Sequence, residues 1–179
     1  MNKEFPVYRT GRLLMRQFTE SDLENVYLGL SNPEVIKYYG VHFTTLDETR
    51  KQIDWFAELE KGETGIWWAV CSADNSTFYG SVGLYYLNSE LKKAELGFWL
   101  MPEFWGQGII TESVQLAIEY GFNKMHLKRI EAAVETENII SKKVLKKLLF
   151  VHESTKKDCE IKNGHHISLD VYALVMSEA

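Results

Sequence analysis

Residues 102–112 have the composition and spacing that most clearly suggest chemistry in this chain. They contain Gly106 and Gly108, one residue apart, between a strand-like run and a helical pattern. Glycine lets the backbone turn tightly and approach a ligand without a side chain in the way. The free N–H groups at the start of the following helix, together with the helix dipole, favour an anion, most naturally a phosphate. The sequence therefore predicts an anion site at this turn.

Two phosphate-binding motifs do not match this segment. A dinucleotide fingerprint needs a third glycine at fixed spacing, and a nucleotide-triphosphate loop needs Gly-Lys-Ser/Thr after the glycines. The run from Gly106 to Thr111 has neither. On spacing alone, a strand-to-helix turn that binds nothing is roughly as good an interpretation.

Hydrophobic spacing predicts the elements that must position this turn. Helical patterns begin at capping pairs, Thr19 with Asp22 and Thr45 with Glu48, and a third runs from about Ile110 to Met125. A fourth helix is predicted over residues 138–149, with Ile140, Val144 and Leu148 buried. Strands are predicted at 12–18, 66–71, 77–87, 93–100, 129–136 and 166–176, and residues 34–44 are expected to be irregular.

The order of these elements defines the expected fold. Short turns join the strands at 66–71, 77–87 and 93–100, so these strands should form an antiparallel meander. The strand–helix–strand unit around the glycine turn should be parallel and right-handed. We expect an α/β (α+β) fold with a largely antiparallel sheet, one parallel crossover and about four helices. The length suggests a single domain over residues 1–179.

Composition narrows the class of protein. The chain has 179 residues, 45% of them hydrophobic and 25% charged, which is an ordinary globular balance. Its net charge is −5 without a basic stripe, so nucleic acid is not expected as a direct partner. Cys71, Cys159 and the histidines show no metal-ligand spacing, and no metal is expected. A signal peptide and a membrane-length apolar run are absent from the sequence, which favours a cytoplasmic protein without a membrane partner.

Several segments together resemble the acetyl-CoA site of the GNAT superfamily of N-acetyltransferases. They are residues 94–100, residues 102–112, residues 12–16 and the start of the late helix at residues 137–141. The resemblance extends from about Thr10 to Phe150 in the expected order and is strongest to the ribosomal-protein-alanine N-acetyltransferase type. It implies a GNAT-like fold and acetyl-CoA as co-substrate, and it favours the anion-site interpretation of the turn.

The resemblance also implies which residues contact the coenzyme. In that family, main-chain N–H groups of the turn hold the pyrophosphate, and the pantetheine arm pairs with the preceding strand. Lys143 either reaches a coenzyme phosphate or shares a solvated face with Lys142, Lys146 and Lys147. The implied coenzyme-binding residues are Phe98, Trp99, Leu100, Gly106, Gln107, Gly108, Ile109, Ile110, Thr111, Asn138, Ser141 and Lys143.

Three positions depart from the family pattern. Trp105 stands where Gln or Arg is common, Ile110 where Gly or Ala is common, and Leu149 where the late helix is usually followed by Gly. Trp105 cannot offer a charged fork to phosphate, and the Ile110 side chain must point away from the ligand. Because none of these changes removes a backbone donor, coenzyme binding is expected to survive.

The implied reaction is transfer of an acetyl group from a thioester to an amine, which needs a base for the ammonium and an acid for the leaving thiolate. Alternation places Glu95, Gly97 and Trp99 on one face of the strand. Glu95 is the candidate base, and small Gly97 is expected to leave room for a substrate. The alternative for Glu95 is a solvated strand residue. Ser141 is the candidate acid or only a coenzyme ligand, because Leu145 occupies the position where many relatives have Tyr.

The acceptor is not encoded in a motif. A protein N-terminal α-amine and a small-molecule amine, including ribosomal-protein, peptide, polyamine and antibiotic acceptors, all stay open. Glu34, Tyr38 and Tyr39 either line the acceptor side or only pack their loop. A non-catalytic coenzyme A binding or sensing module is the alternative function, and a scaffold that binds nothing is a third. The oligomeric state is also open, a homodimer included.

Overall fold

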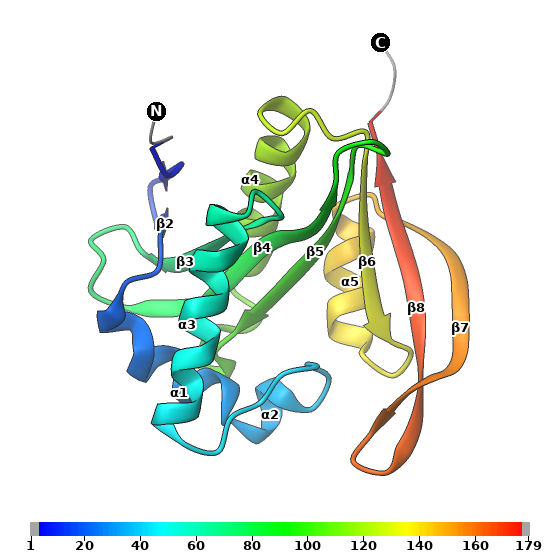
Figure 1. Ribbon diagram of the computed structural model, residues 1–179, viewed down its shortest axis with the longest axis horizontal. Coiled ribbons are helices and arrows are strands. Elements are labelled where there is room, and N and C mark those ends of the chain that lie inside the picture. The colour runs from blue at the N-terminus through cyan, green and yellow to red at the C-terminus, as the bar shows by residue number, and fades with distance from the viewer. Residues whose placement is uncertain (1–3, 177–179) are drawn as a thin grey trace.

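The computed structural model describes residues 4–176, in which eight strands form one sheet with helices on both faces (Figure 1). The strand order is β1-β2-β3-β4-β5-β6-β8-β7. The strands are β1 Tyr8–Arg9, β2 Leu13–Arg16, β3 Ile66–Ser72, β4 Phe78–Asn88, β5 Lys93–Leu100, β6 Arg129–Glu135, β7 Val151–Lys162 and β8 His165–Val175. The helices are α1 Leu23–Leu30, α2 Pro33–Ile36, α3 Leu46–Lys61, α4 Ile109–Asn123 and α5 Ile139–Lys147, with short 3₁₀ turns at Glu20–Asp22 and Pro102–Phe104.

The predicted meander is confirmed. β3 pairs antiparallel with β4, and β4 pairs antiparallel with β5. β5 and β6 are the parallel pair, joined through α4, and every other neighbouring pair in the described sheet is antiparallel. The expected mixed sheet with one parallel crossover is therefore present.

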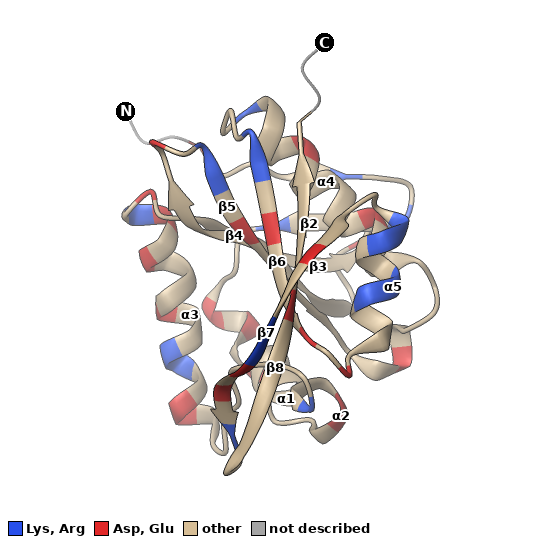
Figure 2. Ribbon diagram, turned by 90° about the vertical axis from the view of Figure 1, so that its right-hand side faces the viewer, with Lys and Arg blue, Asp and Glu red and all other residues tan. Residues whose placement is uncertain are grey.

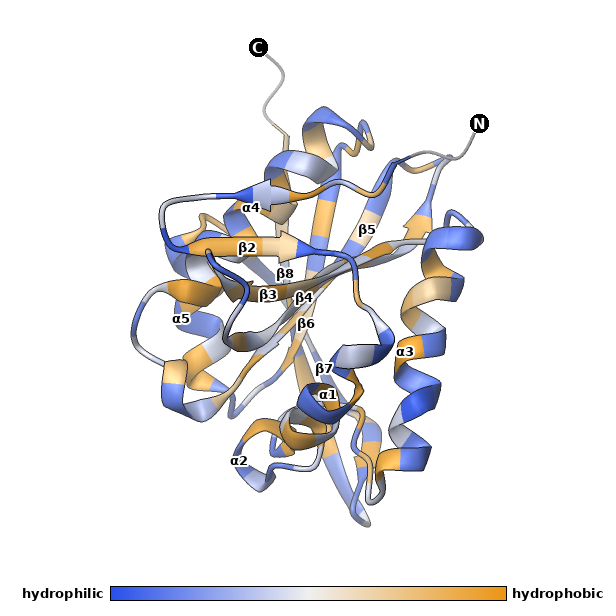
Figure 3. Cartoon of the chain, turned by 90° about the vertical axis from the view of Figure 1, so that its left-hand side faces the viewer, coloured by the Kyte–Doolittle hydropathy of each residue, from blue (hydrophilic) through white to orange (hydrophobic). Residues whose placement is uncertain are grey.

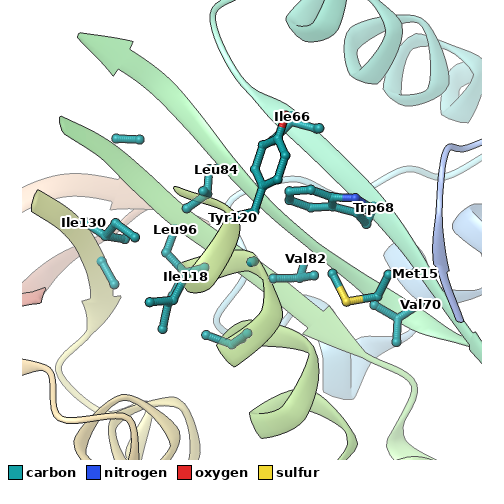
Figure 4. Packing of buried hydrophobic residues seen from close by; sticks show 14 of the residues in the cluster. Met15, Ile66, Trp68, Val70, Val82, Leu84, Leu96, Ile118, Tyr120 and Ile130 are labelled. Carbon is teal, nitrogen blue, oxygen red and sulfur yellow. The ribbon is translucent and has the colours of Figure 1, made fainter. Parts of the chain in front are cut away.

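Two apolar layers hold the helices against the sheet. On one face, Val114 and Ala117 of α4 and Leu145 of α5 pack with Val82 of β4 and other strand residues. Figure 4 shows the centre of this core, where the ring of Tyr120 meets that of Trp68 at a centroid distance of 5.3 Å.

The other face carries α1 and α3. Val26, Phe56 and Leu59 from these helices pack with Trp67 of β3 and Trp99 of β5. Figure 3 shows the matching pattern along α3, where hydrophobic and hydrophilic residues alternate around the helix. A helix of this kind buries its apolar stripe and leaves its polar face in water.

Three elements differ from the prediction. Residues 34–44 are not wholly irregular, because the short α2 begins at Pro33 and continues to Ile36; the fixed φ of proline suits the first helical position. The two-residue β1 was not expected. β7 is not among the predicted strands; its residues 151–161 are all exposed, so it has no apolar alternation. The predicted last strand corresponds to β8, with the turn at Asn163 and Gly164.

Burial in α5 differs from the predicted face. Ile140 is 62% exposed, whereas Leu145 is fully buried in the main core. Val144 and Leu148 are only partly buried. The helix is also shorter than predicted, and its face is turned by about one residue, 100° in a helix of 3.6 residues per turn. None of the helices within residues 4–176 combines the length and the apolar character that crossing a bilayer would require.

Candidate active site

The glycine turn is built as the sequence predicts. Gly106 and Gly108 both have φ of 75°, in the left-handed region that glycine adopts without steric cost. Gly108 is the N-cap of α4, and the first helical bond runs from Glu112 N to Gly108 O at 3.1 Å. The N–H groups of the residues in between therefore precede any acceptor within the helix and are available to an anion.

Arg12 fixes this turn from a distant part of the chain. Its Nε lies 2.7 Å from Glu112 Oε2, and its Nη1 donates to Gln107 O at 2.8 Å. Thr10 Oγ1 donates to the other oxygen of Glu112 at 2.7 Å. Partial burial raises the pKa of Glu112, but the bonds from Thr10 and Arg12 outweigh it and the net pKa is lowered. The carboxylate of Glu112 is thus paired beside the predicted anion site.

Two of the three side chains that depart from the family pattern, Trp105 and Ile110, have structural contacts. Trp105 Nε1 donates to Leu100 O at 2.8 Å, which ties the turn to the end of β5. Ile110 packs against the main core, in agreement with a side chain that points away from the turn. Neither contact uses the N–H groups at the start of α4.

β5 and β6 diverge after a short paired region. They pair only from Lys93 to Glu95 on β5 and from Arg129 to Glu131 on β6. Beyond these pairs β5 bonds to β4, and β6 bonds to β8, so the two strands diverge (Figure 1). Residues 96–100 consequently have no strand partner on the β6 side within the described chain. An extended ligand can pair with such an edge.

Glu95 lies at the point where the two strands separate. It is half-buried, and Tyr85 donates its hydroxyl to Glu95 Oε1 at 2.6 Å. Burial raises the pKa of Glu95, and the nearby carboxylates of Glu131 and Glu160 raise it further. Tyr85 and Lys156 lower it, but the net pKa of Glu95 stays above the ordinary value. A raised pKa brings a carboxylate closer to the range in which it can exchange protons near neutrality.

The expected space beside Glu95 is filled. A Cβ at Gly97 would lie 2.5 Å from Cη2 of Trp67, and one at Gly83 would lie 2.3 Å from Cδ2 of the same ring. Trp67 is also held by a 2.9 Å bond from its Nε1 to Ser81 Oγ. The expectation that Gly97 leaves room for a substrate is therefore wrong, because the two glycines make room for an indole ring.

α5 begins a few residues after the end of β6. Asn138 is its N-cap and accepts a bond from Ser141 N at 3.1 Å. Lys142 reaches inward to Thr136 O and to the carboxylate of Asp170 on β8. Lys142 therefore does not belong to the expected solvated face.

The other lysines of α5 do lie at the surface. Lys143, Lys146 and Lys147 are exposed, and Figure 2 shows the basic residues of this helix in blue. Leu145, at the position where many relatives have a tyrosine, lies in the core and provides no hydroxyl.

The segment after α2 meets the β7–β8 hairpin. Lys162 Nζ donates to Lys37 O at 2.6 Å and lies 2.6 Å from Glu135 Oε1 at the end of β6. Tyr38 and Tyr39 are half-buried in this segment, while Glu34 is exposed. This contact joins three segments far apart in the chain, so no local sequence pattern predicts it.

Residues 4–176 also contain no group of three or more His, Cys, Asp or Glu side chains that could hold a metal ion. The absence of a metal stays a prediction from the sequence.

Comparison with known proteins gives consistent matches. Residues 12–151 match the family model described as an acetyltransferase (GNAT) domain. The chain is 33% identical over 172 residues to the uncharacterized N-acetyltransferase YoaA of Bacillus subtilis, covering 96% of this chain and 97% of that protein.

Two solved structures share the fold. RimL, a ribosomal L7/L12 alpha-N-protein acetyltransferase in complex with coenzyme A, superposes with a TM-score of 0.84 at 23% identity, covering 97% of this chain and 98% of that one. Spermidine N-acetyltransferase from Vibrio cholerae, in complex with CoA and spermine, superposes with a TM-score of 0.82 at 20% identity, covering 93% and 96%. The chain belongs to the GNAT acetyltransferase family and is an acetyltransferase.

Proposed function

We propose that this protein transfers the acetyl group of acetyl-CoA to a primary amine, by direct attack within a ternary complex. One observation carries the proposal. The unpaired edge of β5 connects a half-buried carboxylate, Glu95, to the open N-terminus of α4 at Gly108. An extended thioester whose diphosphate lay at the helix would run along that edge toward the carboxylate.

The coenzyme would lie in the opening between β5 and β6. Its pyrophosphate would accept from the N–H groups of residues 107–111, with Gly106 shaping the turn. Its pantetheine arm would pair with the backbone of Phe98, Trp99 and Leu100. Asn138 and Ser141 at the start of α5 would contact the arm from the other side, and exposed Lys143 would reach a phosphate. The geometry of the turn and the free strand edge support this arrangement.

The chemistry then assigns three tasks. Glu95, directly or through a water, removes a proton from the acceptor ammonium, and the amine nitrogen attacks the thioester carbonyl. A main-chain N–H near Phe98 or Trp99 stabilises the oxyanion. When the C–S bond breaks with its electron pair on sulfur, the thiolate takes a proton from Ser141 or from water, and the proton that the nitrogen sheds as the amide forms restores that donor. The products are an N-acetyl amide and free coenzyme A.

The acceptor is proposed only as a class: a protein N-terminal α-amine or a small-molecule amine. RimL acts on the alpha-amine of a ribosomal protein and the Vibrio cholerae protein is a spermidine acetyltransferase by their names, and both have the fold of this chain. Leu145 is buried in the core and provides no hydroxyl at the position where many relatives have Tyr. That observation favours the alternative of a non-catalytic coenzyme A module, whereas family membership favours the enzyme.

The test is release of free thiol from acetyl-CoA in the presence of peptides with free N-termini, polyamines and aminoglycosides. We expect turnover with at least one acceptor. Glu95→Gln should lower kcat by about a hundredfold and move the pH profile upward, because a weaker proton acceptor replaces the carboxylate. Calorimetric binding of acetyl-CoA without thiol release from any acceptor would favour the non-catalytic module. No binding at all by folded protein would contradict both.

A further inference from the structure

A tyrosine that the proposed chemistry does not use is bonded to the candidate base. Tyr85 of β4 and Glu95 of β5 are direct partners in the antiparallel register, so their side chains project to the same face of the sheet. The hydroxyl of Tyr85 lies 2.6 Å from Glu95 Oε1. This is the length of a charge-assisted O–H···O⁻ bond, which is stronger than a neutral one.

β4 is irregular at this position. The register between β4 and β5 shifts after Tyr85, and the next residue, Tyr86, has φ of 51°. A bulky residue rarely adopts that left-handed conformation, and such strain often persists at functional sites. The main-chain N–H of Leu87 donates to Thr64 O at 3.0 Å, and Thr64 lies just before the start of β3. Bulges commonly re-aim a side chain next to an active site, and this one follows directly after the residue that holds Glu95.

Packing fixes the ring of Tyr85. Its centroid lies 5.5 Å from that of Trp67 and 6.0 Å from that of Trp55, in tilted and edge-on arrangements. Trp67 is itself 4% exposed and hydrogen-bonded to Ser81. The hydroxyl is therefore presented to Glu95 by an aromatic cluster that leaves the ring little freedom to turn.

We propose that Tyr85 is a positioning residue for acetyl transfer: its hydroxyl holds Oε1 of Glu95, so that Oε2 alone faces the acceptor amine. This role rests on the proposed function of Glu95 as the base. When one oxygen of a carboxylate is held in place, the other oxygen is presented to the ammonium in a fixed orientation. That orientation is set before the substrate binds.

The charges around Glu95 give the expected sign of the effect. Burial raises its pKa, and Glu131 on β6 and Glu160 on β7 raise it further, while the Tyr85 bond and Lys156 on β7 lower it. Removing the Tyr85 hydroxyl takes away one of the lowering influences, so the pKa of Glu95 must rise.

Tyr85 itself stays a donor. Its pKa is raised by burial, by Glu95 and, more weakly, by Tyr39 and Tyr86, so the hydroxyl keeps its proton throughout the neutral range.

The test compares Tyr85→Phe with Tyr86→Phe. Tyr86 is adjacent and 72% exposed, with its ring centroid 4.5 Å from that of Tyr85, so it is a matched control. In the free protein, the ¹³Cδ shift of Glu95 is followed against pH, with assignment by loss of the signal in Glu95→Gln. In the enzyme assay, kcat/KM is followed against pH.

We expect Tyr85→Phe to move the Glu95 titration and the acid limb of the rate profile to higher pH, with kcat/KM about tenfold lower on that limb. Tyr86→Phe should match the wild type in both measurements. In the Glu95→Gln background, Tyr85→Phe should have no further effect on the pH profile.

Two results would overturn the proposal. One is an unchanged Glu95 titration in folded Tyr85→Phe; the other is a shifted titration with an unchanged rate profile. Because the titration needs no turnover, it separates this proposal from the proposed function. A wild-type protein without acetyl transfer overturns both.

Discussion

At the residue scale, the Arg12–Glu112 pair explains how an acidic first turn can adjoin the proposed anion site. Glu112 lies in the first turn of α4 and would repel a diphosphate if its charge were uncompensated. The Arg12 guanidinium neutralises it and also holds the carbonyl of Gln107. The same residue therefore shapes the turn and balances its charge.

We predict that Arg12→Met weakens coenzyme A binding about tenfold, because an unpaired carboxylate is left beside the phosphates and the turn loses a tether. Arg50→Met is the matched control: Arg50 is also 50% exposed and pairs with Glu20 at 2.6 Å, away from the turn. Exposed pairs contribute little to folding, so both variants should unfold close to the wild-type denaturant midpoint. Calorimetry measures the affinities; equal affinity in both variants would contradict the role of Arg12.

At the element scale, the backbone of the glycine turn matters more than its side chains. Gly108 caps α4 with φ of 75°, and a Cβ there would lie 3.4 Å from Arg12 Nη2. Alanine at this position would strain the backbone and push the Arg12 side chain, and its methyl group would lie in the turn where we propose that the diphosphate binds.

We predict that Gly108→Ala lowers stability by about 1 to 2 kcal/mol and also weakens coenzyme A binding by more than about tenfold. Gly164→Ala isolates the backbone effect: Gly164 has φ of 79° in the β7–β8 turn, and a Cβ there meets nothing within 4 Å. The Gly164→Ala variant should lose the same amount of stability in urea unfolding, and its coenzyme affinity should be unchanged. Equal affinity losses in the two variants would show that binding only follows stability.

The sequence predicts elements well where the signal is local. Apolar spacing located α3 and the meander, and glycine chemistry located the turn before α4. It failed for β7, whose residues 151–161 face water and carry no apolar alternation. It also failed for contacts set by register or by long-range packing. Trp67 fills the space over Gly97, and Tyr85 reaches Glu95, only because three strands align in one particular register.

At the scale of the whole molecule, Lys162 joins parts of the chain that local rules cannot relate. It connects the end of β7 to the segment after α2 and to the end of β6, across 125 and 27 residues of sequence. Figures 1 and 2 both show the β7–β8 hairpin reaching toward α2. The half-buried Tyr38 and Tyr39 lie in the segment that Lys162 holds. This contact would set how closely the hairpin approaches the acceptor side.

We predict that Lys162→Met loosens this contact without disturbing the coenzyme site. Glu135, whose side chain is 14% exposed, loses its charged partner, so stability should fall by about 2 kcal/mol. Amide hydrogen exchange should quicken in the segments around Lys37 and Lys162, because their shared bond is gone. The KM for the acceptor amine should rise severalfold while the KM for acetyl-CoA stays unchanged. Lys157→Met, a change at an exposed site on the same strand, should leave stability, amide exchange and both KM values at the wild-type value. If the acetyl-CoA KM rises as much as the acceptor KM, the contact supports the sheet as a whole and does not shape the acceptor side.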